Sequence, residues 1–412
     1  MDIEKIRQDF PILGKGVDGK PIVYLDSACM SLRPQQVIDA MNEYYYDFPG
    51  CGGRSIHKIS VKVSSRVDEA REKIKRFINA KGPGEIIFTK NTTEGLNLVA
   101  YSLVHSKKLK KGDIVLTTDR EHNSNMVPWH FINKMWGIEH RIVESNQDNT
   151  FNLENLKNIM AEEGDRIKLI SMVHISNFDG ITIPVEEITK LAHENDAMVM
   201  LDGAQSAAHR DLDMQKLGVD FFAISIHKMC GPSGVGVLYG KNEILDEIEP
   251  EIVGGDTVQN VTYNEVKFLS SPQKFEAGLQ NYAGQIGAGA AVDYLSKIGM
   301  DNISDHEHKL NKIMTEMVLD IPGFSLIGPE DPALRGGILS FNIEGLNSHD
   351  LAMILDEHYN IMIRSGMHCV HSWFNAHNID GAARASVYLY NTEDEVKFFA
   401  EKLGELVNSF NK

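Results

Sequence analysis

Cysteine is scarce in this chain. Its 412 residues include only Cys29, Cys51, Cys230 and Cys369, and no two of them form a Cys-x-x-Cys pair. This usage argues against the dense disulfide framework of small secreted domains and against the paired spacing of zinc ribbons. We therefore predict no metal site, and we expect a reducing, cytoplasmic location.

Long apolar runs and a basic surface are also missing. Charged residues interrupt the most apolar windows within about a dozen residues, whereas a membrane-spanning helix needs about 20 apolar residues. The first ten residues mix both signs of charge and lack the apolar core of a secretory signal. The formal net charge is −17, and binding to nucleic acid or anionic lipid requires basic surface. We expect neither a nucleic acid nor a membrane as a partner.

Short apolar segments of strand length alternate with helical patterns. Apolar residues make up 42% and charged residues 24% of the chain, as in ordinary soluble globular proteins. The predicted strands cover residues 85–89, 113–117, 168–174, 197–201, 221–226 and 235–239, and the predicted helices include residues 64–80, a helix from Glu94 onward and residues 185–195. This alternation predicts an α/β fold with a mostly parallel sheet.

The stretch from Val219 to Tyr239 carries the most informative lysine. Ser225, His227 and Lys228 lie between two predicted strands and are followed by a turn rich in glycine and proline. Burial disfavours a charged ammonium and makes the neutral, nucleophilic amine more accessible. Taken alone, however, the same lysine fits a surface hairpin loop about equally well.

Polar residues follow the predicted strands at five places. They are Thr92, His122, Asn177, Asp202 and Lys228. Ligands of parallel α/β sheets bind at the carboxyl ends of the strands, so we expect these side chains to meet there. Thr92 and Thr93 also stand at a predicted helix start, where they suit either an anion site or a simple helix cap.

Together these residues match the needs of a planar aldehyde cofactor that carries a phosphate. Such a cofactor needs a lysine to form an imine, a carboxylate at its ring nitrogen, phosphate donors, a partner for its ring oxygen and a flat side chain over the ring. Lys228 would form the imine, and Asp202 would face the ring nitrogen. Thr92, Thr93, Ser225 and His227 would donate to the phosphate. Gln205 would pair with the ring oxygen, and His122 would cover the ring. We predict that the cofactor is pyridoxal 5'-phosphate (PLP).

The motifs extend this into a family resemblance over nearly the whole chain. They are Tyr24–Ala28, Arg54-x-x-His57, Thr92-Thr93-Glu94, Glu121-His122, His174-x-Ser176-Asn177, Asp202-Gly203-Ala204-Gln205, Ser225-x-His227-Lys228, Phe275–Gly278 and Arg384-Ala385-Ser386. The chain resembles fold-type I PLP enzymes of the class V aminotransferase group, and within it the SufS-type (group II) cysteine desulfurases and selenocysteine lyases.

The resemblance implies an architecture. It implies a large PLP-binding domain, residues 23–290, with a mostly parallel seven-stranded sheet flanked by helices. A smaller α+β domain, residues 291–412 together with residues 1–22, would carry the catalytic cysteine and the substrate arginine. It also implies a homodimer whose two active sites lie near the subunit interface.

The resemblance also assigns roles. Lys228 would bond to the cofactor and shuttle a proton, Asp202 would face the ring nitrogen, and His122 would stack on the ring as a catalytic residue. Asn177 and Gln205 would lie near the ring oxygen, while Thr92, Thr93, Ser225 and His227 would hold the phosphate. The substrate would contact Arg384, through its carboxylate, and Asn177, Arg364 and His57.

Cys369 distinguishes a desulfurase from its relatives. A free cysteine is ordinarily a small buried apolar residue. The segment from Arg364 to Cys369, however, resembles the Arg-x-Gly-x-His-Cys signature of the SufS-type group. Gly366 offers backbone freedom, and Arg364 and His368 are flanking groups that can favour a thiolate. We expect a flexible loop over residues 366–378, which lets the thiol move.

These features predict a PLP-dependent cysteine desulfurase. L-cysteine would give L-alanine and a persulfide on Cys369, and a sulfur-acceptor protein or an Fe–S scaffold would take the sulfur, most plainly for iron–sulfur cluster assembly. Alternative functions are selenocysteine lyase, cysteine sulfinate desulfinase or aminotransferase on the same fold, with L-selenocysteine as a second substrate. A PLP-free scaffold or sulfur carrier is the alternative from another class.

Four positions depart from the family pattern: Leu279, Cys230, Asn91, which replaces a glycine, and Met367, which stands where a second histidine is common. Leu279 replaces a threonine that reaches the phosphate of the neighbouring subunit, which puts that contact in doubt. Cys230 stands where a tyrosine is common, and it suits either packing or a redox role. The last predicted helix begins with a Thr392-x-x-Glu395 capping box.

Overall fold

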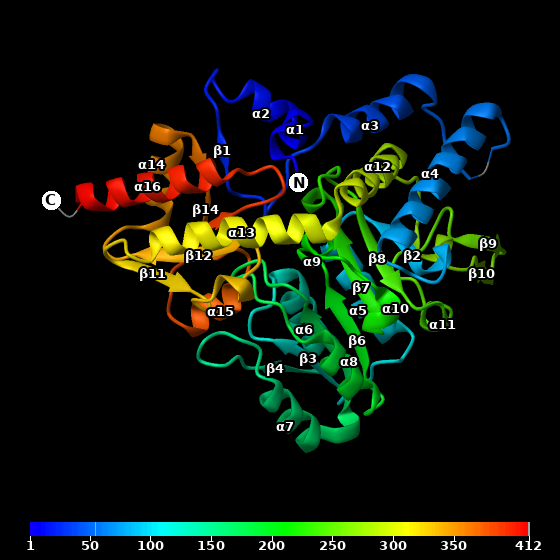
Figure 1. Cartoon of the computed structure of the whole chain (residues 1–412). Coiled ribbons are helices and arrows are strands. Elements are labelled where there is room, and N and C mark those ends of the chain that lie inside the picture. The colour runs from blue at the N-terminus through cyan, green and yellow to red at the C-terminus, as the bar shows by residue number, and fades with distance from the viewer. Residues whose placement is uncertain (54, 411–412) are drawn as a thin grey trace.

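The computed structural model describes residues 1–53 and 55–410. Two β-sheets of different size organise the chain, and the larger one forms the lower right part of Figure 1. Within the described residues, no helix is long and apolar enough to cross a membrane.

The larger sheet has seven strands in the order β2-β8-β7-β6-β5-β3-β4. Their bounds are β2 Ile86–Thr89, β3 Ile114–Thr118, β4 Glu139–Val143, β5 Ile167–Val173, β6 Met198–Asp202, β7 Phe221–Ser225 and β8 Gly236–Gly240. Only β8 pairs antiparallel, with β2 and with β7. The other six strands therefore run in one direction and end at one edge. The predicted mostly parallel sheet is confirmed.

Helices cover both faces of this sheet because neighbouring strand residues point to opposite sides. Leu169 and Phe221 pack on one side in a cluster with α5 and α6, whereas Ile170 and Phe222 pack on the other side with α4, α8 and α12. The helices of this part are α3 Gln35–Asp47, α4 Lys58–Phe77, α5 Thr92–His105, α6 Asn123–Trp136, α7 Leu153–Glu163, α8 Val185–His193, α9 Ser206–His209, α10 Met214–Leu217, α11 Asn242–Leu245 and α12 Tyr282–Ile298. Short 3₁₀ turns lie at η1 Pro83–Glu85, η2 Gly164–Arg166, η3 Ile226–Lys228 and η4 Gln273–Phe275.

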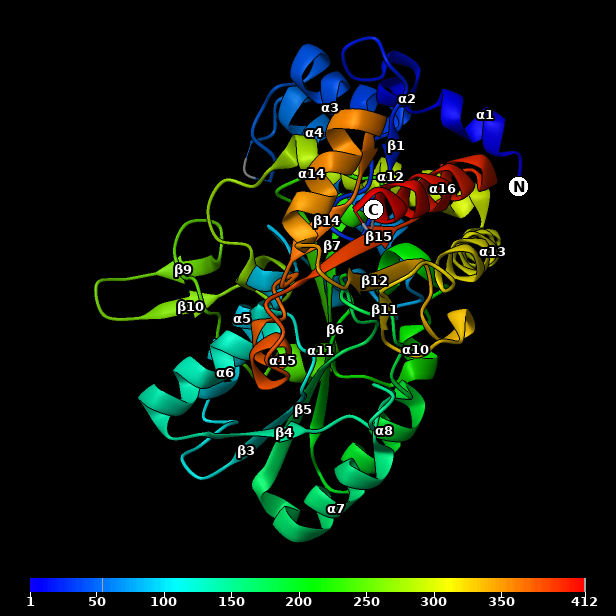
Figure 2. The ribbon, with the colours of Figure 1, turned by 90° about the vertical axis from the view of Figure 1, so that its left-hand side faces the viewer.

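The smaller sheet has four antiparallel strands in the order β11-β12-β15-β14. They are β11 Phe324–Ile327, β12 Ile338–Ile343, β14 Arg364–Gly366 and β15 Ala382–Ser386, accompanied by α13 Met300–Val318, η5 Pro332–Leu334, α14 Ser348–Tyr359, α15 His371–Ala376 and α16 Glu393–Phe410. Helices α13 and α16 lie side by side across this sheet in Figures 1 and 2. A separate apolar cluster, with Leu310, Phe341 and Phe399, forms their core.

The N-terminal segment joins the C-terminal part of the chain. It contains α1 Ile3–Gln8, α2 Pro11–Lys15 and β1 Val23–Tyr24, and β1 pairs in parallel with β13 Ile361–Met362. Arg7 forms an ion pair of 2.8 Å with Glu395. The hairpin of β9 Val258–Val261 and β10 Val266–Phe268 projects from the body in Figure 2. The predicted boundary after residue 290 falls inside α12, and the division into domains stays a prediction.

Local capping explains where the elements differ from the sequence-based prediction. Helix α4 begins at Lys58 rather than near residue 64, because the His57 Nδ1 accepts the amide of Ser60 at 3.3 Å. Asn91, not Thr92 or Thr93, caps α5, since its side chain accepts the amide of Glu94. The predicted capping box before α16 is confirmed by reciprocal hydrogen bonds of 3.1 and 3.2 Å between Thr392 and Glu395.

Candidate active site

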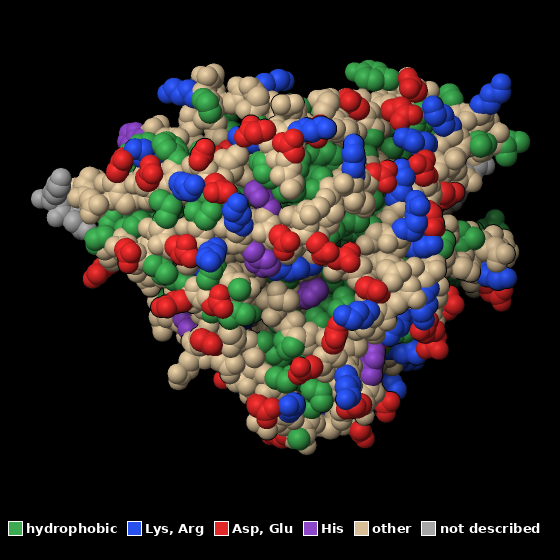
Figure 3. All heavy atoms as spheres, in the orientation of Figure 1, with side chains coloured by type: hydrophobic (Ala, Val, Ile, Leu, Met, Phe, Trp, Pro, Cys, Tyr) green, Lys and Arg blue, Asp and Glu red, His purple; other side chains and the backbone are tan. Residues whose placement is uncertain are grey.

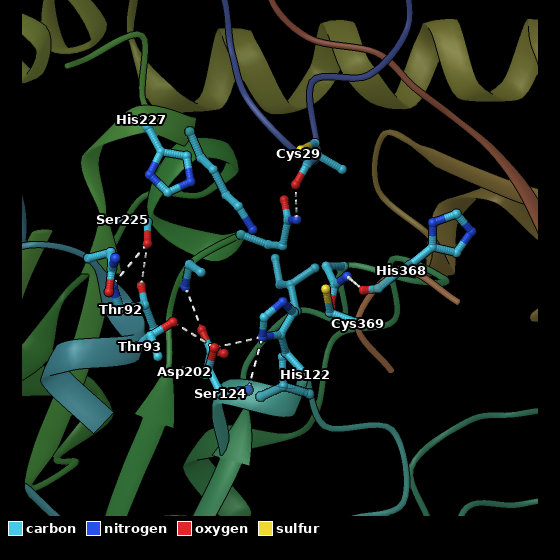
Figure 4. A pocket seen from close by; sticks show the side chains of 18 of the residues that line it. Cys29, Thr92, Thr93, His122, Ser124, Asp202, Ser225, His227, His368 and Cys369 are labelled. Atoms are coloured by element: carbon cyan, nitrogen blue, oxygen red, sulfur yellow. Dashed lines mark hydrogen bonds between the residues drawn. The ribbon is translucent and has the colours of Figure 1, made fainter. Parts of the chain in front are cut away.

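A cavity of about 230 Å³ lies where the carboxyl edge of the large sheet faces β14 and β15 (Figure 4). The five residues predicted to meet at this edge all line it. Its wall also includes most of the other predicted site residues: Thr93, Gln205, Ser225, His227, Arg364, Cys369 and Arg384. Residues from both halves of the chain therefore converge on one cavity.

Lys228 ends the turn η3, directly after β7, and its side chain is partly buried. Burial lowers the pKa of Lys228 to about 8. The positive charge of Arg384 lowers it further, while the carboxylate of Asp202 opposes the shift. The neutral, nucleophilic amine is therefore accessible near neutral pH.

Asp202 is the last residue of β6 and is 3% exposed. One of its carboxylate oxygens accepts the amide of Ala204 at 2.9 Å. Burial raises the pKa of Asp202, and the Ala204 amide and Lys228 only partly counter this. A cation placed beside this carboxylate would stabilise its charged form, which suits a protonated ring nitrogen.

The N-terminus of α5 forms one end of the cavity. The amide of Thr92 donates to the Ser225 Oγ at 3.0 Å, and the Ser225 hydroxyl in turn donates to the Thr92 Oγ1 at 2.8 Å. The Thr93 hydroxyl lies 2.7 Å from the Ser124 Oγ. Hydroxyls at the N-terminus of a 14-residue helix suit an anion such as phosphate. His227 lies near this end in Figure 4 and is neutral, because burial lowers its pKa to about 4.

His122 caps α6, and this fixes its protonation. Its Nδ1 accepts the amide of Ser124 at 3.1 Å. Burial lowers the pKa of His122 to about 3, and the nearby Lys228 and Arg384 add to the effect. The ring is therefore neutral, with its proton on Nε2. A neutral, flat ring at this position suits stacking on a planar ligand.

Two amide side chains that line the cavity have buried oxygens without a partner among the described residues. The Gln205 Nε2 donates to the carbonyl of Ala28 at 2.8 Å and the Asn177 Nδ2 donates to that of His368 at 2.8 Å. The Oε1 of Gln205 and the Oδ1 of Asn177 remain unpaired. Buried polar atoms are ordinarily paired, so both oxygens indicate a place for a ligand.

Arg384 and Arg364 share one carboxylate partner. Arg384, on β15, is 2% exposed and donates to Asp26 at 3.2 Å and to the carbonyl of Asn177 at 2.7 Å. Its Nε has no partner among the described residues. Arg364 donates to Asp26 at 3.5 Å and to the Cys29 sulfur at 3.0 Å. The two guanidinium groups form a cationic wall that suits a carboxylate.

Cys369 lies at the cavity wall with an exposed thiol. It and His368 both adopt a left-handed backbone, with φ of 60° and 49°. Non-glycine residues in this region cost about 1–3 kcal/mol each, and such strain concentrates at functional sites. The carbonyl of Cys369 accepts the amide of Asn123 at 2.7 Å, which ties the segment to the start of α6.

Two expectations about this segment need correction. Residues 366–378 are not a loop throughout, because they contain α15, whose Trp373 and Phe374 are buried against Phe178. His368 supplies no cation beside the thiol. Burial lowers its pKa to about 2, and Arg384 adds to this effect.

Several predicted residues stay outside the cavity. His57 is exposed, caps α4 and is absent from the cavity wall, and Arg54 lies outside the described residues. Leu279 is 74% exposed and borders a different pocket. Cys230 is fully buried and burial raises its pKa to about 12, which favours the packing interpretation.

Sequence reasoning missed Cys29, Asp26 and Ser124 as parts of the site. Cys29 and Ser124 line the cavity, and Asp26 holds both arginines. Asp26 belongs to the motif Tyr24–Ala28, so its place in that motif was a signal. Nothing in the sequence pattern alone singled out Cys29.

The donor set fits PLP. A reactive amine, a buried carboxylate, hydroxyls at a helix N-terminus and two unpaired amide oxygens surround one cavity, and few other ligands use all of them. Within the described residues, no cluster of histidine, cysteine and carboxylate side chains is arranged to hold a metal ion.

Comparison with known proteins agrees with this geometry. The family model described as aminotransferase class-V matches residues 23–399. A probable cysteine desulfurase of Synechocystis sp. is 40% identical, covering 98% of this chain and 96% of its own. A cysteine desulfurase of Escherichia coli is 37% identical, covering 96% of this chain and 95% of its own. The apo structure of a cysteine desulfurase from Thermococcus onnurineus NA1 superposes with a TM-score of 0.92 at 36% identity and covers 98% of each chain. This chain belongs to the class-V aminotransferase family of PLP-dependent, fold-type I enzymes.

Proposed function

We propose that the protein is a PLP-dependent cysteine desulfurase. It converts L-cysteine to L-alanine and places the sulfur on Cys369 as a persulfide. The observation that carries the proposal is one cavity that combines the amine of Lys228, the guanidinium of Arg384 and the exposed thiol of Cys369. Relatives that are 37–40% identical over nearly the full chain are named cysteine desulfurases or probable cysteine desulfurases.

Each part of the cofactor has residues to hold it. Lys228 would bind the aldehyde carbon, Asp202 would face the ring nitrogen and His122 would cover the ring. Asn177 and Gln205 would lie beside the ring hydroxyl, from which their unpaired oxygens would accept a hydrogen bond. The hydroxyls of Thr92, Thr93 and Ser225, together with His227, would surround the phosphate. Bound in this way, PLP supplies an electron sink for negative charge at the α-carbon of an amino acid.

Arg384 and Lys228 act on the substrate. Arg384 binds the α-carboxylate, since its Nε is unpaired and its NH2 is engaged only by Asp26 among the described residues. Arg364 and Asn177, which line the cavity, are proposed as further substrate contacts. Lys228 removes the α-proton with its neutral amine and returns a proton to the product. Its pKa of about 8 suits both steps at neutral pH.

Cys369 performs the sulfur transfer. Its thiolate attacks the substrate sulfur, the substrate C–S bond breaks and an S–S bond forms, leaving Cys369 as a persulfide. The β-carbon takes a proton, and alanine leaves. No external oxidant is needed, because the substrate carbon is reduced as the sulfur is oxidised. The left-handed backbone at His368 and Cys369 supplies a strained segment that can release the thiol toward the substrate.

The proposal extends to partners and location. A sulfur-acceptor protein or an Fe–S scaffold takes the sulfur, for iron–sulfur cluster assembly. A homodimer is supported by exposed apolar side chains on α3, before α4 and in the β9–β10 hairpin: Tyr46 is 83%, Ile56 97% and Val261 63% exposed.

Four free cysteines suit a reducing cytoplasm. Figure 3 shows acidic and basic side chains intermixed on one face, without a basic patch for nucleic acid.

The test is incubation of the PLP-loaded enzyme with L-cysteine. Alanine and sulfane sulfur should form in equal amounts, and both should be lost in Cys369→Ala. L-selenocysteine and cysteine sulfinate serve as competing substrates. Activity on these that survives Cys369→Ala, with little activity on cysteine, would identify a lyase or desulfinase. Keto-acid-dependent amino transfer would identify an aminotransferase, and protein that stays colourless with added PLP would identify a scaffold.

A further inference from the structure

A second thiol shares the cavity with Cys369. Cys29 is partly exposed and lines the cavity, above Cys369 in the view of Figure 4. Of the four cysteines, only these two border the cavity: Cys230 is fully buried, and Cys51 lies beside Tyr282, outside it. The reaction proposed above makes no use of Cys29.

Cys29 stands on a fixed turn. Its amide donates to the carbonyl of Asp26 at 3.1 Å, and the neighbouring Ala28 is held at both ends. The Ala28 amide donates to the Ser386 Oγ at 2.9 Å, and its carbonyl accepts from Gln205 at 2.8 Å. Cys369, in contrast, follows Gly366 on a segment with two left-handed residues. The two thiols that border the cavity thus belong to segments of different backbone conformation.

The guanidinium of Arg364 interacts electrostatically with both Cys29 and Cys369. Its NH1 donates to the Cys29 Sγ at 3.0 Å. Burial lowers the pKa of Arg364, but the anionic forms of Cys29, Asp26 and Cys369 act on the same guanidinium and raise it overall. Negative charge that develops on Cys29 as it attacks, or on Cys369 as it leaves, therefore has a cationic partner within the cavity.

Resting on the proposed function, we propose that Cys29 is a second sulfur-carrying residue, which takes the outer sulfur from the Cys369 persulfide inside the cavity. The Cys29 thiolate attacks the outer sulfur. The bond between that sulfur and the Cys369 Sγ breaks, a bond to the Cys29 Sγ forms, and Cys369 leaves as a thiolate that accepts the proton given up by Cys29. The number of S–S bonds is unchanged, so no oxidant or reductant is consumed.

Attack on the outer sulfur has a longer reach than attack on the Cys369 Sγ. Attack on the Cys369 Sγ itself would form a Cys29–Cys369 disulfide, which requires Cα atoms within roughly 7 Å of each other. Transfer through the outer sulfur adds one S–S bond length, about 2 Å, to the reach of Cys369. Passing the sulfur to Cys29 also frees Cys369 for another substrate while the first sulfur stays bound beside Arg364.

The test locates the sulfur by mass. The PLP-loaded protein is incubated with ³⁴S-labelled L-cysteine, alkylated at set times and digested, and the Cys29 and Cys369 peptides are analysed by mass spectrometry. Label should appear first on Cys369 and then on Cys29. In Cys29→Ala and Cys29→Ser, all label should remain on Cys369. Cys51→Ser is the matched control, with labelling like that of the unmodified protein.

Each other outcome overturns the proposal. Label confined to Cys369 in the unmodified chain excludes the transfer but leaves the desulfurase intact. Label on Cys29 in Cys369→Ser shows direct delivery from the substrate and excludes the order of steps. A Cys29–Cys369 disulfide with released sulfide shows attack on the inner sulfur. Failure of Cys369 itself to take label overturns the desulfurase and, with it, the transfer.

Discussion

Lys228 should lower the free energy of unfolding of the protein, and the size of this destabilisation should depend on pH. The folded structure lowers the pKa of Lys228 from 10.5 to about 8, because burial disfavours the ammonium. Between these two values the unfolded chain binds more protons than the folded one, so stability rises with pH across this window. Replacing Lys228 by methionine, which is of similar length and uncharged, removes the free-energy cost of burying the ammonium. The apoprotein with Lys228→Met should therefore be the more stable one at neutral pH.

The magnitude follows from the two pKa values. At pH 7 both states carry the charge, and the penalty is close to its full value, about 3 kcal/mol. At pH 9.5 the folded state is neutral while the unfolded state is mostly charged, and the penalty falls to about 1 kcal/mol. The variant's advantage should shrink accordingly as the pH is raised.

Urea unfolding of the two apoproteins at pH 7 and pH 9.5 measures this difference directly. Lys190→Met is the control, since Lys190 is exposed on α8 and such surface changes usually stay within about 0.5 kcal/mol. A difference between Lys228→Met and the unmodified protein that is the same at both pH values would refute the assignment of a depressed pKa to Lys228. A destabilised variant at pH 7 would refute it as well.

Three further predictions concern catalysis and packing. Cys369→Ser should abolish alanine formation from L-cysteine while PLP still binds, as judged by its absorption; sustained turnover would contradict the assigned role. Arg384→Lys loses the planar fork, and two charged hydrogen bonds of about 1.5 kcal/mol each correspond to about a hundredfold lower kcat/KM; steady-state kinetics with an unchanged kcat/KM would remove Arg384 from the substrate site. Arg71→Met breaks the buried pair with Glu276, held at 2.7 and 2.9 Å, and should cost about 3–5 kcal/mol in urea unfolding. The double variant with Glu276→Gln should recover part of that loss, and the absence of any recovery would show that the pair is not coupled.

Much of the seven-stranded sheet could be predicted from local patterns. Apolar runs such as 168–174 and 197–201 are typical of buried parallel strands, and the structure places strands there within one residue. The polar residues that follow these strands, such as Asn177 and Asp202, meet because parallel strands end at one edge. The parallel order of the strands therefore brings residues that are far apart in the sequence to one site.

Helix capping and the long-range contacts of short elements were harder to predict. A histidine is not a usual helix cap, so the start of α4 at Lys58 gave no recognised signal. Strand β4 has mostly partly buried residues and no strong alternation. Helix α15 is only six residues long, and long-range contacts of Trp373 and Phe374 with Phe178 hold it in place.

The place of Cys29 in the site could not be read from sequence at all. It lies 340 positions from Cys369 along the chain, in a turn without a periodic pattern. The pairing of β1 with β13, the bridge between Asp26 and Ser386, and the hydrogen bond from Gln205 to the Ala28 carbonyl bring this turn to the cavity. Those contacts are long-range, and local propensity carries no information about them.

The central claim is that an amine, a carboxylate and a thiol serve one coenzyme in one cavity. Its most direct test is a single turnover of the PLP-loaded protein with L-cysteine, in which alanine and the sulfur bound to each cysteine are measured together. The account predicts one alanine for each sulfur gained by the protein, with Cys369 as the first residue to carry it. Alanine released without any sulfur on Cys369, or no alanine from protein that holds PLP, would contradict it.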